Sequence, residues 1–115
     1  MIKTEFGIIK NIEQNKDYSE YEPKKYNCVF IDDDLYINNW WGQLMSMKTY
    51  FHNLNKPAYG LSRYGVTLIP PESLSTFQDI VISDKRIYKD KHLVDLANTI
   101  QDAIDRQKYI IHFGV

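Results

Sequence analysis

The sequence predicts one α+β domain, with a mixed or mostly antiparallel sheet of about five strands and helices packed on one face. Three observations lead to this class. Short runs of β-branched and aromatic residues recur along the chain, and later segments instead place apolar residues at helical spacing. The expected order, β-β-β-α-β-α-α-β, lacks the strict strand–helix alternation of parallel α/β folds. The length of 115 residues fits a single domain, residues 1–115.

The N-terminal third is expected to supply three strands. The first covers residues 2–12, and a long polar loop follows it. Either Tyr18 and Tyr21 of this loop fold back onto the body of the protein, or the loop is mobile and contributes to a binding surface. Residues 26–31 and 35–39 form the next two strand-like runs. The aspartates between them predict a hairpin turn, because Asp side chains bond nearby backbone amides.

The central part of the chain predicts a helix over about 42–54. Apolar side chains recur there at helical spacing, and Pro57 cannot continue a helix. A loop over 58–63 and a strand over 64–69 are expected next. Pro71 suits the first position of a second helix, whose apolar stripe faces the sheet.

The C-terminal part predicts the most regular helix, followed by a strand. Asp90 is the expected N-cap of a helix over about 91–107, which has one apolar and one polar face. The final run, YIIHF over 109–113, predicts a strand. Because it ends the chain, we expect it at a sheet edge, where a second copy could pair with it to form a homodimer.

Composition excludes several classes of function. The net charge of −1 and the lack of a basic run argue against nucleic acid as a partner. No apolar stretch is long enough to cross a membrane and no signal peptide is recognisable, so we expect a cytoplasmic protein without a membrane partner. No zinc, P-loop or dinucleotide motif occurs, so neither a cofactor nor a metal is expected. Cys28 is the single cysteine and is expected to be an inert thiol.

The most distinctive segment is FIDDDLYINNWWG, over residues 30–42. Its three consecutive carboxylates diverge on an extended chain, which disfavours a metal site against a solvated turn or an acidic recognition edge. Of the two adjacent tryptophans, we expect one to anchor the next helix and the other to be partly exposed; a fully buried pair is the alternative. The candidate partner-binding residues are Asp32, Asp33, Asp34, Tyr36, Trp40 and Trp41.

The general character of the chain, more than any single motif, also resembles that of known interaction proteins. The segments GVTLIPPESL (65–74) and KYIIHFGV (108–115) look like those of small bacterial proteins of unknown role. The short α+β profile without a catalytic motif, rich in Tyr, Asp and Asn, is similar to that of immunity proteins from polymorphic-toxin systems. The resemblance implies a protein that neutralises a toxin by covering its active site, and it assigns no role to an individual residue.

The sequence therefore favours an interaction protein over an enzyme. Its sharpest form is an immunity-type inhibitor whose segment 32–41 meets a basic toxin or nuclease. The alternative is a small enzyme or small-ligand-binding protein whose site is assembled from distant segments, with Asp33, Arg63 and His112 as candidates at one end of the sheet. For His112, a packed or surface strand histidine is the simpler interpretation. A concave pocket with converging polar groups would favour the alternative function.

Overall fold

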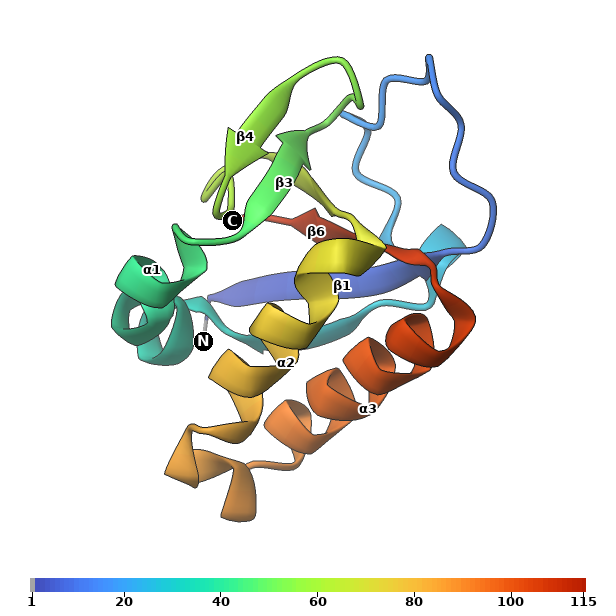
Figure 1. The fold of residues 1–115 in the computed structure, drawn as a ribbon. Coiled ribbons are helices and arrows are strands. Elements are labelled where there is room, and N and C mark those ends of the chain that lie inside the picture. The colour runs from blue at the N-terminus through green and yellow to red at the C-terminus, as the bar shows by residue number, and fades with distance from the viewer. Residues whose placement is uncertain (1) are drawn as a thin grey trace.

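The fold is an open six-stranded antiparallel sheet, seen in a computed structural model that describes residues 2–115 (Figure 1). The strands are β1 (Lys3–Ile9), β2 (Val29–Asp32), β3 (Lys48–Phe51), β4 (Pro57–Tyr59), β5 (Val66–Ile69) and β6 (Tyr109–Phe113). Their order in the sheet is β2-β1-β6-β5-β3-β4, and every neighbouring pair is antiparallel. The predicted α+β class is confirmed, with six strands where about five were expected.

Two long helices cover one face of this sheet. The helices are α1 (Asn38–Leu44), α2 (Leu74–Ile82) and α3 (Lys91–Arg106). Figure 1 shows α2 and α3 side by side beneath the strands, whereas α1 lies at one end of the sheet. The main core fills the space between helices and sheet, and its largest fully buried members include Phe6, Ile31, Ile69, Leu74, Phe77, Leu93 and Leu96.

The opposite face of the sheet is covered by the long loop between β1 and β2. Tyr18 from this loop is buried in a second apolar cluster with Ile9, Leu68 and Ile111. Its hydroxyl accepts a hydrogen bond from the loop backbone at 2.9 Å, so the predicted fold-back of Tyr18 is confirmed. Tyr21 is 64% exposed, although its hydroxyl donates to a Glu carboxylate on β1.

The C-terminal strand lies in the middle of the sheet, so its predicted place at an edge is wrong. β6 pairs with β1 on one side and with β5 on the other. Residues 110–113 are all buried, because one side chain meets the helices and the next meets the loop cluster. Continuous apolar character of this kind belongs to strands buried on both faces. A homodimer through β6 is therefore excluded, and β2 and β4 form the edges.

Residues 33–44 are helical, where a hairpin turn and a strand over 35–39 were predicted. A π-helical turn, Asp33–Ile37, leads directly into α1. Asp32 caps this segment, since its carboxylate accepts a hydrogen bond from the Leu35 amide at 3.3 Å. Two further carboxylates in the first turn complement the helix dipole. The three aspartates thus begin a helix instead of turning between two strands.

The predicted helix over 42–54 is also wrong beyond its first turn. α1 ends at Leu44, and β3 follows as one arm of a hairpin with β4. Thr49 on β3 is buried and donates its hydroxyl to the Gly60 carbonyl at 2.8 Å. Pro57 lies on β4, the edge strand, where the missing amide hydrogen breaks no ladder bond. The expected loop over 58–63 is therefore partly strand.

The C-terminal half matches the prediction closely. α2 and α3 occupy the expected segments, β5 lies within 64–69, and β6 covers 109–113. The carboxylate of Asp90 accepts a hydrogen bond from the His92 amide at 2.9 Å, which confirms the predicted N-cap. A short 3-10 turn beginning at Pro71 precedes α2. These elements have strong local determinants in the form of caps, prolines and apolar periodicity.

His112 is packed in the core, which is one of the two structural roles expected for it, packed or surface. Its Nε2 lies 2.6 Å from the Thr4 Oγ1, and its ring lies 4.8 Å from that of Phe6. Within residues 2–115 its Nδ1 has no hydrogen-bond partner. Complete burial lowers the pKa of His112 to about 3, because the imidazolium cannot be hydrated there. The folded protein therefore holds this ring neutral at physiological pH.

The buried His112 predicts a loss of stability on mild acidification. The unfolded chain binds a proton on this ring near pH 6.5, whereas the folded chain does so only near pH 3. Between these values, unfolding becomes more favourable by about 1.4 kcal/mol for each pH unit lost. We expect His112→Leu to remove this dependence, measured as the free energy of urea unfolding at several pH values. The half-buried His92 is the control: His92→Gln retains the slope, and an unchanged slope in His112→Leu contradicts the assignment.

Candidate functional site

The structure divides the six predicted partner-binding residues between interior and surface. Asp33, Tyr36 and Trp40 are 2–3% exposed and have partners inside the protein. Direct contact with a partner molecule is therefore open only to the other three. These three are the half-buried Asp32 and Trp41 and the exposed Asp34. Of the two arrangements considered for the tryptophans, one anchor and one partly exposed ring is the arrangement found.

Tyr36 and Trp40 attach the helical segment 33–44 to the turn after α2. The Trp40 indole donates to Asp84 at 2.9 Å, the Tyr36 hydroxyl donates to Asp90, and the two rings stack with centroids 5.4 Å apart. Arg86 lies over the Tyr36 ring and binds both oxygens of Asp84. The Arg86 guanidinium holds the pKa of the Asp84 carboxyl at about 2, so the Asp84–Arg86 ion pair persists at neutral pH.

Asp33 and Arg63 meet, as the hypothesis of a site assembled from distant segments predicted. The Arg63 Nη2 and Nε lie 2.7 and 3.2 Å from the same oxygen, Oδ2 of Asp33. The carboxylate is 3% exposed and the guanidinium side chain 23% exposed. His112, the third member of that hypothesis, is buried and bonded to Thr4 instead. The arrangement is an ion pair that holds Arg63 in place.

Arg63 presents the open side of its guanidinium to the surface beside α1. Its Cζ lies 5.7 Å from the Trp41 ring centroid. Trp41 and Met45 are one helical turn apart, and Met45 rests on Gly60, where an added Cβ would lie 2.6 Å from its sulfur. Gly60 also has a positive φ of 72°, which favours glycine. We name this region the aromatic patch. The contacts above join Trp41, Met45 and Arg63, and Tyr59 and Tyr64 are included as the exposed chain neighbours of Gly60 and Arg63.

The aromatic patch is well exposed and combines three separate segments of the chain. Met45 is 45% exposed, Tyr59 56% and Tyr64 79%. The patch draws on α1, on the edge strand β4 and on the loop that precedes β5. Of its members, only Trp41 belongs to the site predicted from sequence. Met45 follows Trp41 by one helical turn, whereas Tyr59, Arg63 and Tyr64 are distant from Trp41 along the chain.

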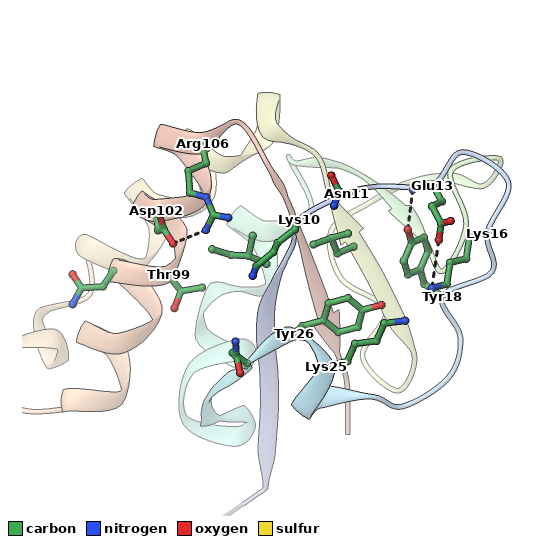
Figure 2. A pocket seen from close by; sticks show the side chains of 14 residues that line it. Lys10, Asn11, Glu13, Lys16, Tyr18, Lys25, Tyr26, Thr99, Asp102 and Arg106 are labelled. Atoms are coloured by element: carbon green, nitrogen blue, oxygen red, sulfur yellow. Dashed lines mark hydrogen bonds and ion pairs between the residues drawn. The ribbon is translucent and has the colours of Figure 1, made fainter.

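A groove of about 540 Å³ is the second surface feature (Figure 2). It lies between the C-terminal half of α3 and the loop that follows β1, with the end of β1 as its floor. Lysine, arginine, asparagine and tyrosine side chains line it. The sequence indicated only that this loop could contribute to a binding surface, since the residues of α3 opposite it are far away along the chain.

Metal ligands and the single cysteine are the remaining candidates for a chemical role. Among residues 2–115 no group of three His, Cys, Asp or Glu side chains is placed to hold a metal ion. Burial raises the pKa of the Cys28 thiol to about 12, so it is protonated and weakly nucleophilic at neutral pH, in agreement with the predicted inert thiol. In the same part of the chain, no helix is both long and apolar enough to cross a bilayer.

Comparison with protein-family models, with curated proteins and with solved structures finds no match to this chain. The aromatic patch and the groove are therefore the features of the molecule that indicate its function.

The Asp33–Arg63 pair predicts an unequal effect of removing its two partners. Arg63→Met leaves a carboxylate uncompensated in the interior, and we expect a loss of about 3 kcal/mol of unfolding free energy. Asp33→Asn leaves a guanidinium that still reaches water, so its cost is smaller. Urea unfolding of both variants measures the difference. The exposed pair of Arg106 and Asp102 is the control, since Arg106→Met there costs less than about 1 kcal/mol. Equal costs for Arg63→Met and Arg106→Met contradict the interpretation.

Proposed function

We propose that this protein is a protein–protein interaction module and that the aromatic patch is where its partner binds. The supporting observation is the exposure of neighbouring Trp, Met, Tyr and Arg side chains at one end of the sheet. Interfaces between proteins are enriched in these four residue types. Trp, Tyr and Arg also dominate the residues that contribute most of the binding free energy.

The residues beneath the patch hold its anchors in fixed positions. Asp33 fixes the Arg63 guanidinium through two hydrogen bonds to one oxygen. Trp40 and Tyr36 attach the helix that presents Trp41 to acids after α2. A side chain that is already ordered loses less conformational entropy on binding. Asp33, Tyr36 and Trp40 are thus buried, and they support the proposal by holding Arg63 and Trp41 in position.

The acidic residues next to the patch suggest the charge of the partner. Asp34 is exposed at the start of the same helical segment, where its carbonyl accepts a hydrogen bond from the Asn38 side chain at 3.1 Å. Asp32 is half-buried beside it. Carboxylates at an interface rim accelerate association with a basic partner and exclude an acidic one. The sharpest form of the proposal is an immunity-type inhibitor that covers the active site of a basic toxin or nuclease in the cytoplasm.

The alternative function, a small enzyme or small-ligand-binding protein, draws its support from the groove alone. Asp33 and Arg63 neutralise each other, and His112 is enclosed in the core. These three residues therefore offer a substrate no shared cavity. The groove is lined by other side chains, from α3 and from the loop after β1.

The proposal predicts that two substitutions in the patch weaken binding without unfolding the protein. Trp41→Ala combined with Tyr64→Ala removes two exposed rings, and loss of one such anchor costs about 2 kcal/mol, or about 30-fold in affinity. The partner is first identified by affinity purification from the native cell. Its dissociation constant is then measured for wild type and variant by biolayer interferometry, with circular dichroism to confirm the fold.

The chain offers a matched control for this experiment. Tyr88 is 86% exposed in the turn between α2 and α3, outside the patch. Tyr88→Ala is expected to leave the affinity unchanged, whereas Asp34→Lys slows association with a basic partner. A partner that binds wild type and the Trp41→Ala, Tyr64→Ala variant equally well would show that the patch is not the interface.

A further inference from the structure

We propose that the groove between α3 and the loop after β1 binds a small organic phosphate, in which a phosphate group is joined to a flat ring. The groove is at the opposite end of β1 from the aromatic patch. The amide of Asp33, the residue that holds Arg63, donates a hydrogen bond to the carbonyl of Ile2, which precedes β1. Lys10, in the groove, follows the last residue of β1. The two sites are therefore independent, and either proposal can fail without the other.

The groove exists because β1 is longer than its neighbour. The pairing of β1 with β2 ends at Phe6 and Val29, so β1 continues for three residues without β2 beside it. Tyr26 crosses β1 at Gly7, where an added Cβ would lie 2.7 Å from the Tyr26 Cβ. The space left beyond this crossing measures about 540 Å³. Sites for small molecules span about 300 to 1,000 Å³.

Positive charge is concentrated in the groove although the whole chain has a net charge of −1. Four cationic side chains face two carboxylates, an excess of two positive charges. Glu13 pairs with Lys16 at 3.6 Å and Asp102 with Arg106 at 3.1 Å. Arg106, Asp102 and Glu13 are solvent-exposed and Lys16 is half-buried, so both ion pairs are weak and their cations can turn to a ligand. The cationic residues are Lys10, Lys16, Lys25 and Arg106.

Lys10 and Lys25 differ from the other two cations, and the Lys25 Nζ lies 5.7 Å from the centroid of the Tyr26 ring. Among residues 2–115, neither Lys10 nor Lys25 forms an ion pair with a carboxylate. Figure 2 shows Lys10 extending across the groove between Thr99 of α3 and Tyr26 of the loop. A negatively charged ligand here would gain charge-assisted hydrogen bonds without breaking an existing pair at Lys10. The charge therefore points to an anion.

The neutral side chains narrow the class of anion. Asn27, Asn98 and Thr99 add amide and hydroxyl donors suited to phosphate oxygens. A phosphate monoester has a charge of about −2 at neutral pH, which matches the excess of positive charge. Free phosphate would leave most of the groove to water. The Tyr26 ring and the Ile8 side chain offer apolar surface against which a flat ring can stack.

Adenosine monophosphate is a suitable probe, because it joins a phosphate monoester to a flat ring. We expect it to bind with a dissociation constant of about 1 mM or lower, measured by titration into ¹⁵N-labelled protein. The amide signals that shift should belong to the loop after β1 and to the end of α3. Adenosine and inorganic phosphate should each bind about tenfold more weakly, since adenosine lacks the phosphate that meets the cations and inorganic phosphate lacks the ring that meets the apolar surface. Affinity should also fall as salt rises.

A pair of charge-matched variants tests the location. Lys10→Gln with Arg106→Gln is expected to weaken binding of the nucleotide about tenfold or more. Lys89→Gln with Lys91→Gln removes the same charge at the opposite end of α3, at exposed positions, and should leave the affinity within about twofold. Equal weakening by the two pairs would overturn the proposal, because it would show a diffuse charge effect.

Three further results would overturn the assignment of ligand class. The absence of signal shifts in the groove at about 10 mM nucleotide would exclude phosphate binding there. Equal affinity for adenosine would show that the cations do not contribute. Tighter binding of a single-stranded oligonucleotide than of the mononucleotide would replace the small ligand by nucleic acid. Circular dichroism of each variant ensures that lost binding is not lost folding.

Discussion

The whole structure depends on the burial of β6 from both sides. This strand lies between β1 and β5, and each of its faces meets apolar side chains. Helices α2 and α3 cover only one of these faces. The loop between β1 and β2 therefore has to cover the other, and Tyr18 supplies the buried side chain that does so. Because burial of apolar surface is the dominant favourable term in folding, this arrangement constrains every other segment.

Both candidate surfaces follow from that constraint. After Tyr18 has covered the second face, the loop passes β1 at Gly7 on its way to β2, and the groove is the space left beyond this crossing. At the other end of the sheet, the residues after β6 bond the segment before β5: the amide of Gly114 donates to Gly65 and that of Val115 donates to Arg63. The backbone of Arg63 is thereby fixed next to Asp33 and Trp41.

Two ion pairs hold the helical segment 33–44 between the sheet and the turn after α2. Asp33 pairs with Arg63 at its start, and Trp40 bonds the Asp84 that is paired with Arg86. Desolvation costs much of what such pairs gain, so their main effect here is to fix geometry. That geometry leaves Trp41 half-buried on the outer side of the helix, where it can serve recognition.

The sequence by itself determined the α+β class, the helices α2 and α3 with the Asp90 cap, the strand β6 and the inert Cys28, because caps, prolines and periodicity act within one or two turns. It also indicated Trp41 as a recognition residue, and it named Asp33 and Arg63 as candidates while leaving open whether they meet. Only the tertiary structure decided the central place of β6, the helical state of 33–44, the burial of Asp33, Tyr36 and Trp40, and the groove. The place of β6, the buried side chains and the groove all depend on residues distant along the chain. In segment 33–44, the Asp32 cap and tertiary packing together override the local strand propensity.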